Sequence, residues 1–322
     1  MRNTTKVEKR TVQLVQSVLY LQEINKIKRL FEQNNIDFVF LKGLPLHLYY
    51  ENEFPRRIYA DCDLLIQEKD YNLVSDLLSQ QDYIQCTHEL YPLQSYFRRS
   101  NPLEVSFSKK IGGVKIEFDI HTSIVFSIPT LGYTDKLYPT KLLKDFTQKC
   151  LKTKRAVNIN NFLFPIISPS LLIVYLSLHL FNHLFTGPYR FKLLKKIMEY
   201  EFHKNHVDWP TIQRIIREYS LENYIYPVFL IAKREYSIAI PDYIITSLEP
   251  TSFLAKKRVK TILSRPRGTY SNRKHIGIER FINLFLLSPV SWYRRLTIFT
   301  DLSVLITIIV TVWQKGVFIG RK

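Results

Sequence analysis

Glycine, cysteine and acidic residues are all scarce in this chain of 322 residues. Its nine glycines form neither GxxxxGK(S/T) nor GxGxxG, which excludes the nucleotide-binding loops built on those patterns. Its three cysteines show no CxxC spacing, so we expect neither a disulfide framework nor a cysteine zinc site. Free thiols are typical of a reducing compartment, and the polar residues 1–10 predict no signal peptide. We therefore expect a cytoplasmic protein, with membrane association left open by the apolar C-terminal tail.

The deficit of acidic residues leaves a strongly basic chain. Asp and Glu number 28 against 46 Lys and Arg, for a net charge of +18. One interpretation is a polyanionic partner, such as a nucleotide, a nucleic acid or an anionic lipid. The other is a solvated basic surface with no specific partner. Charge of this kind governs association and not fold.

Hydrophobic periodicity divides the chain into four parts. Residues 1–36 predict an N-terminal helix, and residues 37–125 predict a core of short strands alternating with helices. Residues 126–250 read as a mainly helical second domain, and residues 251–322 as a basic linker followed by an apolar tail. The expected fold class is therefore α+β, with a mixed β-sheet flanked by helices and then a helical C-terminal domain.

The most informative segment is a pair of aspartates at the start of an apolar strand. Asp61 and Asp63 are followed directly by Leu64, Leu65 and Ile66. Residues i and i+2 of a strand point to the same face, so the two carboxylates would project together and could hold divalent cations. A DxD pattern alone also occurs at solvated turns and strand edges, so its neighbours in the sequence matter.

An acidic hairpin strand supplies that context. Gly112-Gly113 predicts a hairpin turn, and the strand after it alternates in polarity. Its polar face carries Lys115, Glu117, Asp119 and His121. Asp119 is the expected third carboxylate, with Glu117 as the alternative. His121 could assist proton transfer or could orient a carboxylate through a hydrogen bond.

Three acidic groups on neighbouring strands suit phosphoryl or nucleotidyl transfer. Two-metal catalysis needs carboxylates that converge on ions roughly 3.5–4 Å apart. These ions activate the attacking hydroxyl and neutralise charge that develops on the phosphate oxygens.

Three sequence blocks, in order, resemble a bacterial family of uncharacterised nucleotidyltransferases within the DNA polymerase β-type superfamily. The blocks are Leu41-Lys42-Gly43, then Arg57-Ile58-Tyr59-Ala60-Asp61-Cys62-Asp63-Leu64-Leu65-Ile66, then Asp119-Ile120-His121. The resemblance implies a nucleotidyltransferase-type mixed sheet and a helical second domain. It also implies that Asp61 and Asp63 bind Mg²⁺ or Mn²⁺, with Asp119 as a third ligand or a general base.

The same resemblance assigns the phosphate contacts. Lys42 and Gly43 stand where the wider superfamily has a Gly-Ser turn at the triphosphate, and the ammonium of Lys42 is expected to bind phosphate. Arg57 is expected to contact a second phosphate or the acceptor. Its alternative role is a salt bridge that orients Asp61.

The expected function is transfer of a nucleotidyl group from an NTP, such as ATP, to a hydroxyl or phosphate of a small molecule, peptide or saccharide. A second hypothesis is a biosynthetic tailoring transferase that uses a nucleotide-sugar or other diphosphate donor. A third is a basic binding protein with a degenerate site. No motif in the sequence supports a nucleic-acid partner.

The second half of the chain leaves three features open. Residues 256–274 are rich in Lys and Arg and read as a basic linker or surface loop. His179 and His183 are four apart, which fits either a zinc pair or histidines of the core. Residues 296–313 are apolar apart from Asp301 and a few Ser and Thr. They could span a membrane, form a peripheral amphipathic contact, or be buried in the second domain.

Overall fold

The structure is a computed structural model that describes residues 6–52, 59, 61–86, 104–124, 137–184, 189–265 and 273–300. These residues form two compact units. The first contains the described residues up to 86 together with 104–124 and 147–168, and the second contains 137–146 and the described residues from 169 onward.

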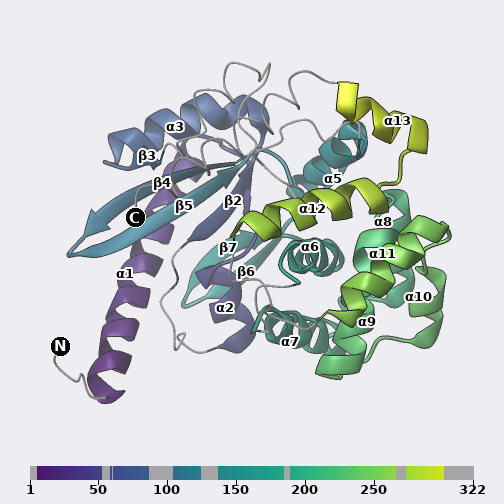
Figure 1. The fold of residues 1–322 in the computed structure, drawn as a ribbon. Helices are drawn as coiled ribbons and strands as arrows, with labels where there is room; N and C mark the ends of the chain where they lie inside the picture. The colour runs from purple at the N-terminus through teal and green to yellow at the C-terminus, as the bar shows by residue number, and fades with distance from the viewer. Residues whose placement is uncertain are drawn as a thin grey trace, which may run out of the picture. The chain divides into compact units, whose positions relative to one another are not determined.

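A seven-stranded mixed sheet is the centre of the first unit (Figure 1). Its order is β3-β4-β5-β2-β1-β7-β6. The strands are β1 (Phe38–Phe40), β2 (Cys62–Ile66), β3 (Ile84–Cys86), β4 (Glu104–Ile111), β5 (Val114–His121), β6 (Arg155–Ile159) and β7 (Phe162–Ile166). Strands β2 and β5 are parallel, whereas β1 and β2 are antiparallel. The mixed α+β fold expected from the sequence is confirmed.

The β4–β5 hairpin sets the register next to β2. Gly112 and Gly113 form its two-residue turn with φ of 54° and 83°, the positive values that a tight hairpin turn of this kind needs. Counting outward from this turn, Ser106 lies opposite Asp119 and Glu104 lies opposite His121.

The β6–β7 hairpin was not recognised in the sequence. Its residues lie in the range that the sequence analysis gave to a helical second domain, but both strands extend the sheet beside β1. Asn160 and Asn161 make its turn with positive φ, and the side chain of Asn158 accepts a hydrogen bond from the Asn161 amide. Two asparagines between β-prone residues were the available signal.

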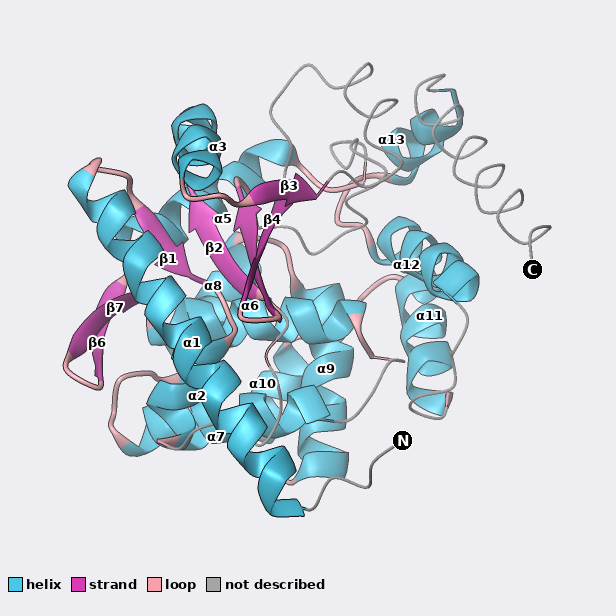
Figure 2. Cartoon of the chain, turned by 90° about the vertical axis from the view of Figure 1, so that its left-hand side faces the viewer, coloured by secondary structure: helices cyan, strands magenta, loops and turns pink. Residues whose placement is uncertain are grey.

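The described helical elements that lie wholly in this unit are α1 (Lys6–Gln33), α2 (Leu44–Glu51), the short 3₁₀ turn η1 (Glu68–Asp70) and α3 (Tyr71–Gln80). Helix α1 runs along the sheet (Figure 2). Its buried residues Ile24, Ile27 and Phe31 follow the helical period, and Tyr20 stacks on Phe118 of β5. Since Phe118 and Asp119 point to opposite faces of β5, α1 covers the face away from the aspartates.

The second unit is helical, as expected. Its helices are α6 (Pro169–Asn182), α7 (Tyr189–His203), α8 (Trp209–Glu218), α9 (Glu222–Tyr236), α10 (Asp242–Ser247), α11 (Phe253–Ser264), α12 (Arg273–Leu287) and α13 (Trp292–Leu296), followed by η3 (Thr297–Thr300). Helix α6 is apolar on almost every side and packs against α7, α8 and α9. Helix α5 (Thr140–Lys152) contributes residues to both units.

The segment expected to be a basic linker is helical over its described first part. Residues 256–264 belong to α11, and Arg258 is buried there. Its guanidinium donates to Asn283, 2.6 Å away, and pairs with Glu279 of α12. Buried charged residues need such partners, which a pattern of basic residues does not reveal.

The sequence left open whether residues 296–313 cross a membrane, lie on its surface or are buried. The structure describes residues 296–300 of this segment, and residues 301–322 lie outside the described residues. Within the part of the chain that the structure describes, no helix has the length and hydropathy needed to cross a bilayer.

Candidate active site

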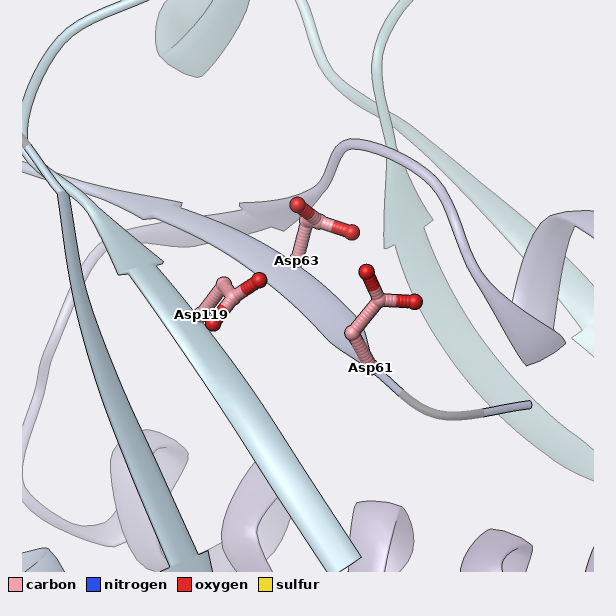
Figure 3. Close-up of side chains that lie close together, drawn as sticks. All are labelled: Asp61, Asp63 and Asp119. Atoms are coloured by element: carbon pink, nitrogen blue, oxygen red, sulfur yellow. The ribbon is translucent and has the colours of Figure 1, made fainter. Parts of the chain in front are cut away.

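Three aspartates converge at the carboxyl-terminal part of β5 and the start of β2. Asp63 lies within β2, directly beside Asp119 of the parallel strand β5, and Asp61 immediately precedes β2. Figure 3 shows the three carboxylates pointing toward one another. One oxygen of each lies within 4.8 Å of the others.

The apolar part of β2 and β5 explains why the carboxylates are held so firmly. Leu64 and Leu65 of β2 and Phe118 and Ile120 of β5 are at most 1% exposed. Their burial fixes both strands, so the backbone places Asp63 and Asp119 at one register position. Two of the three carboxylates are therefore held on strands, and Asp61 directly precedes one of them.

Asp63 is the most buried of the three, with 1% exposure. Its Oδ1 accepts from Lys42 Nζ at 2.7 Å and from His121 Nε2 at 3.0 Å. Its Oδ2 is buried and has no hydrogen-bond partner among the described residues. A buried, charged oxygen without a partner is costly unless a cation or a water completes it.

The pKa of Asp63 reports this environment. Burial alone would raise the pKa, but the charge of Lys42 and the hydrogen bond from His121 outweigh it and lower the pKa to about 2. Conversely, burial lowers the pKa of Lys42, and the charges of Asp63 and Asp61 raise it above its usual value. Asp63 and Lys42 are both charged at neutral pH.

Asp119 is held by a residue that the sequence analysis did not single out. Ser106 Oγ on β4 donates to Asp119 Oδ1 at 2.5 Å. Burial and the nearby charge of Asp63 raise the pKa of Asp119 to about 7. Asp119 can therefore gain or lose a proton near neutral pH.

Asp61 is the accessible member of the group. Its side chain is 46% exposed, and Lys42 Nζ lies 3.9 Å from its Oδ2. It can therefore reach both the buried pair and solvent. A site with one exposed and two buried carboxylates is open on one side, which a substrate needs.

His121 lies next to this group on β5 and is buried. Since the Asp63 carboxylate is ionised, the His121 Nε2 hydrogen donates to it, and Nδ1 faces Glu104 Oε2 at 4.0 Å. Burial lowers the pKa of His121, and the bond to Asp63 and the charge of Glu104 raise it above the usual value. The contact with Asp63 agrees with one of the two roles expected for His121, that of orienting a carboxylate through a hydrogen bond.

Gly43 gives the site its close packing. It begins α2 with φ of 97°, and a Cβ there would meet the carbonyl oxygen of Asp61 at 3.2 Å and the Cα of Cys62 at 3.4 Å. A side chain at this position would push on the backbone that carries Asp61. Glycine is therefore needed for both its conformation and its small size.

Replacing Gly43 with alanine is expected to destabilise the fold by about 1–3 kcal/mol, because the positive φ and the close approach both penalise a Cβ. Gly113→Ala is the matched control, since its φ is also positive but a Cβ there meets nothing within 4 Å. Denaturant unfolding measures the stability, and a Mg²⁺ titration measures the site. We expect Gly43→Ala alone to weaken Mg²⁺ binding; equal binding losses in both variants would contradict this reading.

The other residues predicted for the site do not join the three aspartates among the described residues. Glu117 pairs with Lys115 and is not part of the carboxylate group, so Asp119 is the residue that the structure brings to Asp61 and Asp63. Arg57 lies outside the described residues. The rings of His179 and His183 lie 4.7 Å apart. Among the described residues, the aspartate group is the only set of three or more potential metal ligands that converge, so the two histidines have no third ligand there.

The donor set fits a hard divalent cation. Carboxylate oxygens are the ligands that Mg²⁺ and Mn²⁺ prefer, and thiol or imidazole ligands are not part of the group. The unpartnered Oδ2 of Asp63 is where such an ion would complete the buried charge. Ser106 and His121 supply hydrogen bonds behind the ligands, as outer partners of metal sites do.

Three comparisons with known proteins differ in what they show. No curated protein matches the chain. Among solved structures, the crystal structure of an antigenic nucleotidyltransferase-like protein from Paracoccidioides brasiliensis is similar, with 15% identity and a TM-score of 0.36. The match covers 76% of this chain and 93% of that one, and at this score it supports no residue correspondence. The model of the family described as "Uncharacterised nucleotidyltransferase" matches residues 7–236, which include the sheet, the three aspartates and helices α6 to α9. The chain belongs to this uncharacterised nucleotidyltransferase family.

Proposed function

We propose that this protein transfers a nucleotidyl group from an NTP to a hydroxyl or phosphate of an acceptor, with Mg²⁺ or Mn²⁺ held by Asp61, Asp63 and Asp119. The observation that carries the proposal is the buried Oδ2 of Asp63, which has no hydrogen-bond partner among the described residues although Asp63 belongs to a group of three converging carboxylates. Acceptors could be small molecules, peptides or saccharides.

The chain's own residues support each part of the reaction. When bound, the divalent ion would neutralise charge on the phosphate oxygens and help activate the acceptor hydroxyl. His121 and Ser106 hold Asp63 and Asp119 in fixed orientations. Asp119, with its pKa raised to about 7, suits either ligation or acceptance of the acceptor's proton.

Lys42 and Gly43 are proposed to bind the donor's phosphates. The Lys42 ammonium lies at the carboxylate group, where phosphate oxygens would approach the ion. In this arrangement Lys42 balances the carboxylates before the donor arrives, and its charge is then available to a phosphate oxygen. Arg57 is proposed as a second phosphate or acceptor contact.

The donor is tested by product analysis. The purified protein is incubated with Mg²⁺, each NTP or nucleotide sugar, and a panel of acceptors. Release of pyrophosphate with the nucleotide label on the acceptor supports nucleotidyl transfer. Release of nucleoside diphosphate without pyrophosphate would instead support the nucleotide-sugar hypothesis and overturn the proposed donor.

Binding of Mg²⁺ is expected to tighten as pH rises from about 6 to 8. The raised pKa of Asp119 means that the metal-free protein carries a proton there below about pH 7, and the ion must displace it. Calorimetry in buffers of different ionisation enthalpy measures the released proton. The Asp119→Asn variant should bind weakly with no such pH dependence, and a pH-independent wild type would contradict the prediction.

The raised pKa of Asp119 also predicts how the stability of the metal-free protein changes with pH. An unfolded aspartate titrates near about 3.9, so between about pH 4 and 7 the folded protein holds a proton at Asp119 that the unfolded chain lacks. The contribution of Asp119 to stability therefore falls as pH rises through this window. Asp119→Asn should flatten that part of the pH–stability curve.

A further inference from the structure

The segment α13–η3 exposes an unusual number of large apolar side chains. Their exposed fractions are 45% for Trp292, 81% for Tyr293, 43% for Leu296 and 49% for Phe299. Single exposed apolar residues are common, but four within eight residues are a denser group than usual and are a candidate for an interaction surface. We call these four residues the α13 patch.

A network of hydrogen bonds holds this patch in place. The Arg295 guanidinium donates to four backbone carbonyls, those of Phe285, Leu286, Ser288 and Val290, at 2.7–3.2 Å. These bonds tie the end of α12 to α13. The exposed rings are therefore presented on a fixed frame and are not the side chains of a loose end.

Aromatic packing against α12 also holds the patch in place. Phe285 of α12 contacts Trp292 and Phe299, with ring centroids 5.2 Å and 5.5 Å apart. Each of these two rings thus has one packed side, although about half of its surface remains open. Tyr293 is the most exposed member of the patch, at 81%. Helix α13, which carries it, is labelled in Figure 1.

The charged residues near the patch in the sequence are mostly basic. Arg294 is exposed and lies between Tyr293 and Arg295 in the sequence. From residue 280 to 322 the sequence has six Lys or Arg and one acid, Asp301. A partner for this part of the chain should therefore carry negative charge.

The adjoining sequence adds an apolar component. Residues 302–313 contain no charged residue, and Lys315 follows soon after.

We propose that the α13 patch binds the surface of an anionic bilayer, with Trp292, Tyr293 and Phe299 at headgroup level and Arg294 on lipid phosphate. Trp and Tyr favour this boundary because one end of each ring is apolar and the other polar. Basic residues beside them add attraction to anionic lipid. A protein or nucleic-acid partner is a competing outcome of the test. The proposal does not depend on the proposed transferase activity.

Vesicle co-sedimentation of the full chain tests this. Vesicles are made from phosphatidylcholine alone or with about one third phosphatidylserine. We expect at least about tenfold stronger partitioning onto the anionic vesicles, weakened when salt rises from about 0.1 M to about 0.5 M. Failure to bind anionic vesicles, or equal binding to both, would overturn the proposal.

Variants assign the binding to the patch. Tyr293→Ser combined with Leu296→Ser should reduce partitioning about tenfold, and Arg294→Glu should reduce it several-fold at low salt. The matched controls are Tyr243→Ser, whose side chain is 56% exposed on α10, and Lys260→Glu, which is exposed on α11. These should change it less than about twofold. A loss with Arg294→Glu but not with the double variant, or an equal loss in the controls, would show attraction by charge alone and overturn the proposal.

Discussion

Replacing Asp63 with asparagine is expected to lower metal-dependent turnover by at least about 10³-fold. The substitution keeps the size of the side chain and one oxygen but removes the buried charge that an ion would need. It also leaves Lys42 and His121 without the carboxylate that they share. Pyrophosphate release in the presence of Mg²⁺ is the activity readout, and Mn²⁺ titration followed by electron paramagnetic resonance is the binding readout.

Two companion variants separate this effect from a loss of folding. The side chain of Asp61 is 46% exposed, so Asp61→Asn should leave the fold intact while it weakens binding of the divalent ion. Asp76→Asn makes the same chemical change at an exposed position of α3 and should leave activity unchanged. Retention of full turnover by both folded Asp61→Asn and Asp63→Asn would show that the carboxylates do not hold a catalytic ion.

Replacing Lys42 with methionine is expected to have two opposite effects. The metal-free protein should lose about 3 kcal/mol, because one partner of a buried ion pair is removed and Asp63 remains. Mg²⁺ should then bind more tightly than in the wild type, since the ion no longer competes with the ammonium for the carboxylates. The stabilisation by Mg²⁺, measured as a shift in Tm, should accordingly be larger in the variant.

Binding of the donor nucleotide should become weaker in the same variant. If the Lys42 ammonium contacts phosphate, Lys42→Met should raise the KM for the NTP by about tenfold or more, which corresponds to about 1.4 kcal/mol. Lys42→Arg keeps the charge and should recover part of the loss. An unchanged KM together with tighter Mg²⁺ binding would limit Lys42 to balancing the carboxylates and would remove it from the phosphate site.

Much of the site could be read from the sequence because strands impose a period of two. The alternation in residues 114–121 placed Asp119 on the polar face, and the DxD spacing placed Asp61 and Asp63 together. The turn at Gly112-Gly113 also fixed the register of the hairpin. Counting outward from that turn would have paired Ser106 with Asp119, so this contact was predictable although it was missed.

Other contacts join residues that are far apart in the sequence, and no local pattern predicts them. The pairing of β2 with β5 is parallel and joins residues more than 50 apart along the chain. No local pattern specifies that Asp63 and Asp119 share a register position. The buried pair between Arg258 and Glu279 is a second case. A run of basic residues indicated a linker or a surface loop, whereas tertiary packing of α11 on α12 buries Arg258.

The central claim is that Asp61, Asp63 and Asp119 hold a divalent cation, and anomalous diffraction from a crystal grown with Mn²⁺ tests it most directly. We expect an anomalous peak among the three carboxylates, about 2.1 Å from Oδ2 of Asp63. Lys42 Nζ should then have moved away from Asp63 Oδ1. A crystal in which Mn²⁺ binds elsewhere, with Lys42 and His121 still paired to Asp63 and no peak at its Oδ2, would contradict the account.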